Sequence, residues 1–304
     1  SPVFSPDGNM VAFVRDNNIF LVKMLYGNSE SQVTEDGKFN HVLNGIPDWV
    51  YEEEFSFATA LEFSPDNTML AFIRFDESEV ASFTFPIFAG QAPHYSALET
   101  YPGAYTYKYP KAGEANSKVS VHTFDIKSKV TRKMKLPLDP DGYIPRIRFT
   151  QDAAKLAIMT LNRNQNRFDL YFADPRSTLC KLVLRDESPY YINESVFDNI
   201  MFYPQNFSFI SEKDGYSHLY WYSMGGNLVK QVTKGKFEVK RFIGWDAATN
   251  TFYFESNEES PLRTAVYKTD KKGGRIKLSE KAGTNSAIFS SNLKYFMNTY
   301  SNLQ

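Results

Sequence analysis

The chain has 304 residues, with 34 lysines and arginines against 35 acidic residues, so its net charge is -1. This length allows a large buried core, and the balanced charge argues against a nucleic-acid-binding protein, which normally carries a basic excess. The single cysteine, Cys180, excludes an intrachain disulfide, and no apolar run approaches the ~20 residues that a membrane-spanning helix needs.

The first residues resemble a strand and show neither an initiator methionine nor the basic and apolar segments of a secretion signal. We therefore expect the chain to be a piece of a longer protein.

A turn followed by a strand recurs along the chain. Residues 4–15 (FSPDGNMVAFVR) match residues 63–74 (FSPDNTMLAFIR) almost position for position, and residues 149–158 form a third copy. Proline presets the backbone of the turn, Asp, Asn or Gly tolerates its second half, and the alternating residues that follow form a strand. Weaker copies begin at Tyr203, Trp245 and Phe289.

The spacing of these copies indicates the fold class. Their first residues are separated by 59, 86, 54, 42 and 44 residues, and apart from the longest these intervals suit the four-stranded antiparallel blades of a β-propeller, which repeat about every 40–50 residues. A β-sandwich of hairpins is the alternative, but near-identical units favour repeats. We predict an all-β chain in which residues 1–304 form a single propeller domain with about six blades.

The segment 48–55 (DWVYEEEF) places three consecutive carboxylates, Glu52 to Glu54, directly after two aromatic rings. Adjacent carboxylates repel, so packing them beside aromatic surface costs free energy unless a cation compensates. Neighbouring strand residues point to opposite sides, so two of them converge on one ligand only from a turn or short helix, where they sit ~100° apart. Pro47 followed by Asp48 predicts such a short helix. A solvated acidic face is the alternative.

The longest interval between copies contains residues 83–118, which are rich in proline, glycine and tyrosine. We expect this stretch to be a long insertion in one elaborated blade.

The familiar catalytic motifs are missing. Residues 215–219 (GYSHL) lack the second glycine of the hydrolase motif Gly-x-Ser-x-Gly. The four histidines are scattered without metal-ligand spacing, and neither a phosphate-binding loop nor a dinucleotide fingerprint occurs. We therefore expect no catalytic residue, metal site or cofactor in this chain.

Several segments, in order, resemble the propeller domain of dipeptidyl peptidase IV-like serine peptidases of the prolyl oligopeptidase group. The segment 48–55 is the most specific of them, since many propellers share Ser-Pro-Asp turns. The others are residues 63–66 (FSPD), 109–116 (YPKAGEAN), 212–218 (EKDGYSH) and 232–235 (VTKG) with Glu238 and Val239.

The resemblance implies an exopeptidase that removes dipeptides from peptide N-termini, with proline or alanine as the second residue. In that family the second and third carboxylates of the Glu run bind the substrate's α-ammonium group, which here are Glu53 and Glu54. A Phe-Arg pair lines the family's extended pocket. Phe197 is its counterpart here, although Asp198 departs from the pattern. The family propeller has eight blades, and its Ser-Asp-His triad lies on a following α/β-hydrolase domain, so we expect that domain after residue 304 and no activity from this chain alone.

The resemblance also implies partners and a location. The expected partners are the N-terminus of a peptide substrate, the protein's own C-terminal hydrolase domain and a second copy in a homodimer, with no nucleic acid and no membrane segment. Since no disulfide can form, a bacterial member of the family is expected rather than a mammalian ectodomain, and the compartment that the resemblance implies is the periplasm or cell surface.

Two other functions are open. A non-catalytic propeller that serves as a binding scaffold would account for the repeats but not for the Glu run. A propeller glycosidase needs two carboxylates across a pocket, which consecutive glutamates fit poorly.

Overall fold

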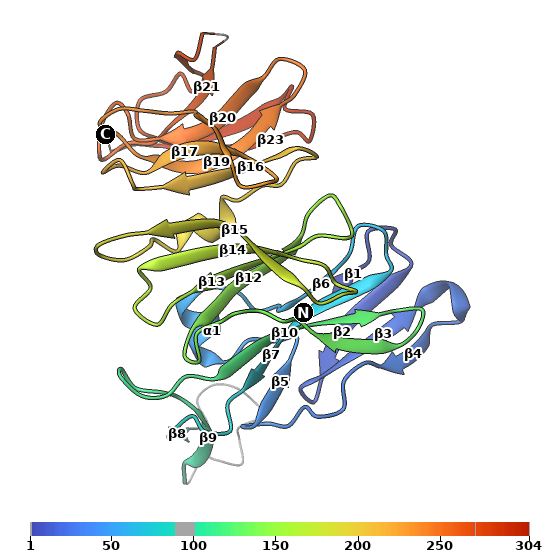
Figure 1. Ribbon diagram of the computed structural model, residues 1–304. Helices are drawn as coiled ribbons and strands as arrows, with labels where there is room; N and C mark the ends of the chain where they lie inside the picture. Colours follow the sequence, from blue (N-terminus) through green and yellow to red (C-terminus); the bar gives the residue numbers. More distant parts are fainter. Residues whose placement is uncertain (1, 89–100, 271, 304) are drawn as a thin grey trace. The chain divides into compact units, whose positions relative to one another are not determined.

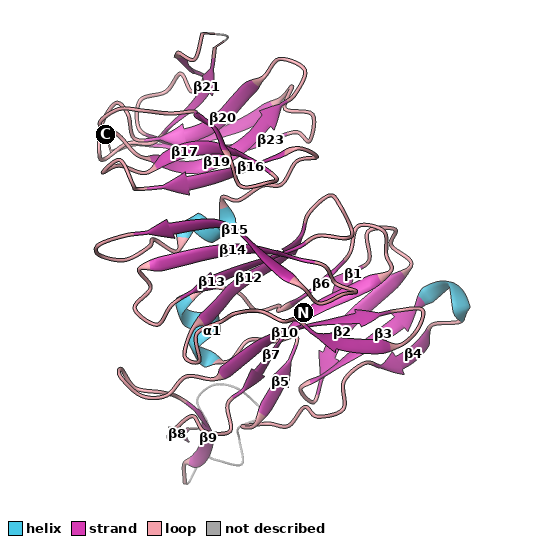
Figure 2. Cartoon of the chain, viewed as in Figure 1, coloured by secondary structure: helices cyan, strands magenta, loops and turns pink. Residues whose placement is uncertain are grey.

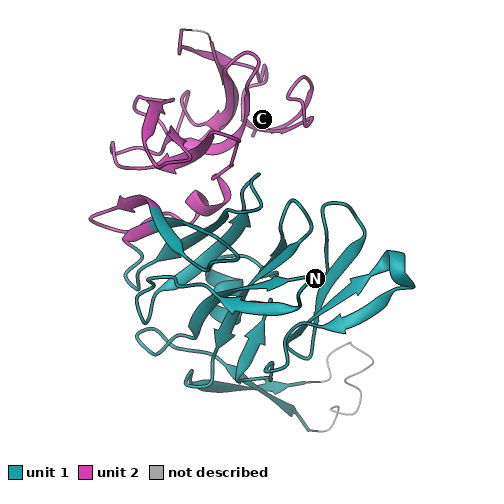
Figure 3. Cartoon of the chain, turned by 45° about the vertical axis from the view of Figure 1, so that its right-hand side comes forward, with its two compact units in different colours: residues 1–165, 169–182 teal, residues 166–168, 183–304 magenta. Residues whose placement is uncertain are grey.

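The computed structural model (Figure 1) describes residues 2–88, 101–270 and 272–303. It divides into two compact units, which are described separately (Figure 3). Unit 1 comprises residues 1–165 and 169–182, and unit 2 comprises residues 166–168 and 183–304. Antiparallel strands dominate both, with few helical turns (Figure 2). The prediction of a single domain over residues 1–304 stays a prediction.

The first sheet of unit 1 is an antiparallel meander in the order β1-β2-β3-β4. Its strands are β1 (Val3–Phe4), β2 (Met10–Arg15), β3 (Asn18–Lys23) and β4 (Ser29–Gln32).

The repeated turns are built alike. The Ser5 hydroxyl donates to Asp7 at 2.6 Å and accepts from a backbone N–H at the start of β2. Ser64 and Asp66 make the same pair at 2.6 Å before β7 (Met69–Asp76). Gly8 and Asn67 occupy the left-handed position at φ of 72° and 61°, which glycine and asparagine adopt most readily. The predicted repeat of turn and strand is confirmed for these two copies.

The second sheet departs from a simple meander. It contains β5 (Val42–Asn44), β6 (Leu61–Phe63), β7, β10 (Lys118–Asp125) and β11 (Val130–Lys133). Both β5 and β6 pair with β7, at successive positions along it. Between them the chain leaves the sheet, and Ala60 N–H donates to the Gly45 carbonyl at 2.9 Å where it returns. This excursion contains α1 (Trp49–Glu54), so the predicted short helix is confirmed.

The predicted insertion lies between two strands of this sheet. The strands on either side of it, β7 and β10, pair directly with each other. Between them a separate hairpin forms from β8 (Ser82–Ile87) and β9 (Gly103–Lys108). Residues 89–100 of the insertion lie outside the described residues.

The third sheet has the order β12-β13-β14-β15, and the boundary between the units passes through its last two strands. Its strands are β12 (Tyr143–Phe149), β13 (Leu156–Leu161), β14 (Arg167–Ala173) and β15 (Cys180–Glu187).

Unit 2 holds a short helix, α2 (Ser195–Asp198), and three further antiparallel sheets. These are β16 (Asn206–Ser211), β17 (His218–Ser223) and β18 (Leu228–Gln231); β19 (Val239–Asp246), β20 (Thr251–Ser256), β21 (Ala265–Thr269) and β22 (Arg275–Lys277); and β23 (Thr284–Phe289) with β24 (Phe296–Ser301).

The cores lie between successive sheets. In unit 1, Leu21 of the first sheet and Phe72 of the second belong to one buried cluster. In unit 2, Trp221 of β17 and Phe254 of β20 belong to another. Removal of these apolar faces from water is the main stabilising contribution.

Candidate functional site

The α1 helix begins at a defined cap. The backbone of Asp48 is extended, and its side chain accepts a hydrogen bond from Tyr51 N–H at 3.0 Å. Such a cap satisfies one of the N–H groups that the first turn of a helix leaves unpaired. The helix ends where Phe55 N–H donates to the Tyr51 carbonyl at 3.2 Å. The helix start that Pro47 and Asp48 predict is therefore the one observed, with Asp48 as the cap.

Tyr51 anchors the helix in the core. Its side chain is 1% exposed, and its ring lies 4.8 Å from that of Phe75 and 5.1 Å from that of Phe55. Its hydroxyl accepts a hydrogen bond from Ile144 N–H at 3.0 Å. Burial raises the pKa of Tyr51 well above its usual value. Because this ring fixes the rotation of the helix, the carboxylates that follow it face outward.

Two buried acids lie at the start of the helix, the cap Asp48 and Glu77, whose charges interact. Asp48 accepts a second hydrogen bond from the hydroxyl of Ser117, which directly precedes β10, and burial raises its pKa. Glu77 is 5% exposed. Burial raises its pKa to about 7, the charge of Asp48 adds to the shift and that of Lys108 opposes it. The start of the helix is therefore held by a buried carboxylate, and a second buried acid lies close enough for the two charges to interact.

The two carboxylates predicted to bind an ammonium group, Glu53 and Glu54, lie differently with respect to the adjoining pocket. Glu52, Glu53 and Glu54 are all exposed. Only Glu54 lines the adjoining pocket, whose volume is ≈ 590 Å³. Glu53 lies outside the lining, and its charge adds to the rise in the pKa of Tyr107 that desolvation mainly causes. Of the two predicted ligands of an ammonium group, Glu54 thus lies at the pocket, and Glu53 is its neighbour in the chain.

We call this cavity the Glu54 pocket. Aromatic rings form part of its wall, with Trp49 and Tyr109 centred 4.1 Å apart. All its residues belong to unit 1, namely Trp49, Val50, Glu54, Tyr109, Pro110, Lys111, Ala112, Asn116, Tyr143, Arg163 and Gln165.

The sequence did not identify the basic and amide side chains of this pocket. Lys111 and Asn116 lie in one of the segments that carry the resemblance, but neither was singled out, and Arg163 lies far from both in the chain. The pairing of β10 with β7 brings residues 109–117 back beside α1, and Arg163 comes from the connection between β13 and β14.

Phe197 does not reach a described pocket surface. It lies in α2 of unit 2, its side chain is fully buried, and its ring lies 6.0 Å from that of Phe168. A substrate contact by Phe197 stays a prediction.

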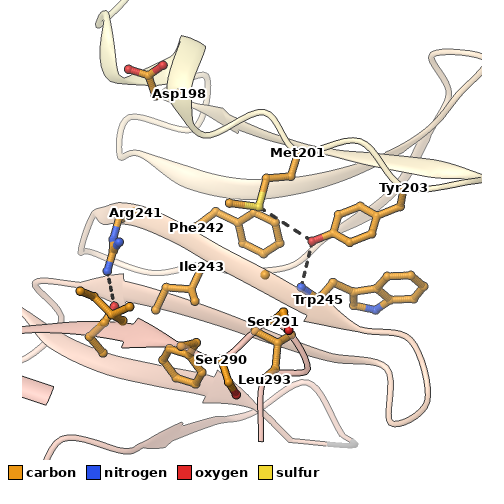
Figure 4. A pocket seen from close by; sticks show the side chains of 14 residues that line it. Asp198, Met201, Tyr203, Arg241, Phe242, Ile243, Trp245, Ser290, Ser291 and Leu293 are labelled. Atoms are coloured by element: carbon orange, nitrogen blue, oxygen red, sulfur yellow. Dashed lines mark hydrogen bonds between the residues drawn. The ribbon is translucent and has the colours of Figure 1, made fainter. Parts of the chain in front are cut away.

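The next residue, Asp198, lines a different pocket of ≈ 510 Å³ in unit 2 (Figure 4). There the Tyr203 hydroxyl accepts from Trp245 N–H at 3.0 Å and lies 3.9 Å from the sulfur of Met201. Arg241 donates to the Ala287 carbonyl at 2.6 Å. The lining contains neither histidine nor cysteine, so we assign no chemistry to this pocket.

The described residues contain no group of three or more His, Cys, Asp or Glu side chains that could hold a metal ion. Within the same residues, no helix has the length and apolar character that crossing a bilayer requires.

Comparisons with known proteins agree on one family. A model of the dipeptidyl peptidase IV N-terminal region matches residues 1–304. A probable dipeptidyl peptidase 4 of Aspergillus fumigatus is 28% identical over 282 residues, which cover 87% of this chain and 35% of that protein. Dipeptidyl aminopeptidase B of Saccharomyces cerevisiae is 29% identical over 329 residues, covering 98% and 38%.

Solved structures give the same result. The crystal structure of dipeptidyl peptidase 4 from Porphyromonas gingivalis superimposes with a TM-score of 0.92 at 47% identity, over 99% of this chain and 42% of that one. A putative dipeptidyl aminopeptidase IV of Bacteroides ovatus has a TM-score of 0.80 at 22% identity, over 99% and 43%, and supports the fold alone. The predicted β-propeller fold class is confirmed. The chain spans less than half the length of each of these relatives.

Proposed function

The chain belongs to the family of dipeptidyl peptidase IV N-terminal regions, and on that basis we propose that it is the substrate-gating propeller of a serine exopeptidase. The parent enzyme removes X-Pro and X-Ala dipeptides from the N-termini of peptides. The propeller contributes recognition of the free N-terminus, and the bond is cleaved on another domain.

One observation carries the proposal: Glu54 lines a pocket from the end of a helix whose start is capped and whose core face is buried. The backbone that carries this carboxylate is already ordered, so binding an ammonium group costs further ordering only of the side chain. Charge-assisted hydrogen bonds from an ammonium to carboxylates are stronger than neutral ones.

The proposed ligands of the ammonium are Glu53 and Glu54. Fixing the N-terminus at this helix limits how far the peptide enters and sets the cleavage point two residues along, which is positioning of the substrate. Phe197 would reach a peptide only after a rearrangement of α2, because its ring is fully buried. The proposal therefore rests on the two glutamates.

The first proposed partner, a hydrolase domain of the same protein, follows from the length of the relatives. The curated and structural relatives exceed this chain by more than half of their own length, which leaves room for a hydrolase domain that supplies the Ser-Asp-His triad. This chain alone would then be inactive.

A second copy of the protein is the other proposed partner. The hairpin β8–β9 exposes Phe83, Phe85 and Tyr105, at 38%, 37% and 47%. Exposed apolar patches of this kind mark contact surfaces. The proposed location is outside the cytoplasm, in the periplasm or at the surface of a bacterium.

Product analysis tests this function directly. The full-length protein is incubated with a decapeptide that begins Gly-Pro and with its N-acetylated twin, and the products are identified by mass spectrometry. Release of the first dipeptide from the free peptide alone is expected. Cleavage of both peptides would contradict recognition of the N-terminus, and cleavage of neither would favour a non-catalytic binding propeller.

A further inference from the structure

The charges of the Glu54 pocket do not match a simple ammonium site. Its lining holds one carboxylate, that of Glu54, against two cationic side chains, Lys111 and Arg163. A ligand that carried only an ammonium group would pair with the glutamates and leave both cations of the lining without a partner. The pocket therefore fits a ligand that brings a negative group as well.

Neither Lys111 nor Arg163 has an ion-pair partner in the part of the chain that the structure describes. The Glu114 carboxylate there accepts from the backbone N–H of Lys111 at 3.0 Å. Arg163 donates to the Glu114 carbonyl at 2.9 Å and lies 5.9 Å from the ring centre of Tyr143. The ammonium nitrogen of Lys111 lies 5.8 Å from the ring centre of Phe83. Because these contacts are made with a carbonyl and two rings, both charges stay available to a ligand in the pocket.

A third donor lies in the same lining. The amide nitrogen of Asn116 is buried and has no hydrogen-bond partner among the described residues. Buried donors are almost always paired in folded proteins, and each exception calls for an explanation. A ligand with an acceptor oxygen would satisfy this one.

We infer that the Glu54 pocket selects peptides whose first residue is aspartate or glutamate. The α-ammonium group stays with Glu53 and Glu54, as proposed above, and the side-chain carboxylate accepts from Arg163, Lys111 and the Asn116 amide. The volume of ≈ 590 Å³ lies within the range of pockets that enclose small ligands. This inference rests on the proposed function and adds a preference for the first residue of the substrate.

The test compares two nearly isosteric substrates of the full-length protein, Glu-Pro and Gln-Pro linked to the same chromogenic leaving group. The ratio of their kcat/KM values isolates the negative charge, because every other contact is shared. We expect a ratio above one that falls about fivefold in Arg163→Met, near the upper limit for one partly exposed charge pair, and also falls in Lys111→Met. The matched control is Lys127→Met, an exposed lysine outside the pocket, which should leave the ratio unchanged.

Ionic strength gives a second readout. Between roughly 0.05 M and 0.5 M salt the screening length shortens several-fold, so the ratio for the unaltered protein should approach one. A purely structural role of Arg163 would not produce this dependence. The thermal midpoint of each variant shows whether it is folded.

The outcomes separate the two proposals. A ratio of one that neither the variants nor salt change, with both substrates cleaved, overturns the preference and leaves the peptidase assignment standing. Absence of cleavage of either substrate and of Ala-Pro overturns both.

Discussion

The side-chain carboxylate of Asp48 accepts a hydrogen bond from the hydroxyl of Ser117, 69 residues further along the chain. Both side chains are buried. The contact joins the start of α1 to the residue before β10. The helix that presents Glu54 is therefore held to the sheet by its cap as well as by its core face.

The first prediction concerns this contact. Asp48→Ala removes the cap of α1 and leaves the Ser117 hydroxyl unpaired, so it should lower the free energy of unfolding by about 1–3 kcal/mol. Ser117→Ala should lower it by about 1 kcal/mol. Urea unfolding of the two single variants and the double variant measures the coupling. Strictly additive effects would show that the two side chains do not interact.

The second prediction concerns the ring beneath the helix. Tyr51→Phe keeps the packing but leaves Ile144 N–H without its acceptor, so it should destabilise the fold by about 1–2 kcal/mol. Tyr51→Ala also opens a cavity among the surrounding rings and should cost about 3–5 kcal/mol. Chemical unfolding distinguishes the two. Equal losses would mean that the ring contributes little to packing.

The third prediction concerns pH. Burial raises the pKa of Glu77 from 4.5 to about 7, so the folded protein favours the neutral acid. Its contribution to stability is fully present below pH 4.5 and is lost as the pH rises towards 7. The slope attributable to this group is at most about 1.4 kcal/mol per pH unit. Glu77→Gln should therefore flatten the decline of stability over this range and raise stability at pH 8 relative to the unaltered protein.

A matched control exists, because burial also raises the pKa of Glu62 to about 7. Glu62→Gln should remove a separate part of the same slope, and the double variant should remove both. Thermal midpoints between pH 4.5 and 8 measure these slopes. A steep decline that survives in the double variant would assign it to other groups.

The sequence predicted the repeated turns and the short helix, but it did not predict which distant side chains meet in the Glu54 pocket. The turns at Ser5 and Ser64 follow from Ser-Pro-Asp, because the serine and aspartate side chains bond each other within two residues. The short helix follows from Pro47 and Asp48 in the same way. Local hydrogen bonds of this kind are encoded by neighbours in the chain.

The features that the sequence did not reveal depend on long-range pairing. Lys111 and Arg163 meet Glu54 in one pocket because distant strands pair, and no spacing in the sequence reports that. The sequence also does not say to which side a ring points: the ring of Phe197 is fully buried in the structure, and its contact with a substrate stays a prediction.

The central claim is that Glu53 and Glu54 bind the ammonium group of a peptide, and the most direct measurement is kcat/KM of the full-length protein for an Ala-Pro reporter in Glu53→Gln and Glu54→Gln. Each should fall about 10²–10³-fold, as for loss of one partner of an ion pair that substrate binding encloses. The matched control is Glu52→Gln, the exposed glutamate of the same run that is not a proposed ligand, which should stay close to the unaltered value. Values of kcat/KM for Glu53→Gln and Glu54→Gln that equal those of Glu52→Gln, in folded protein, would contradict the assignment.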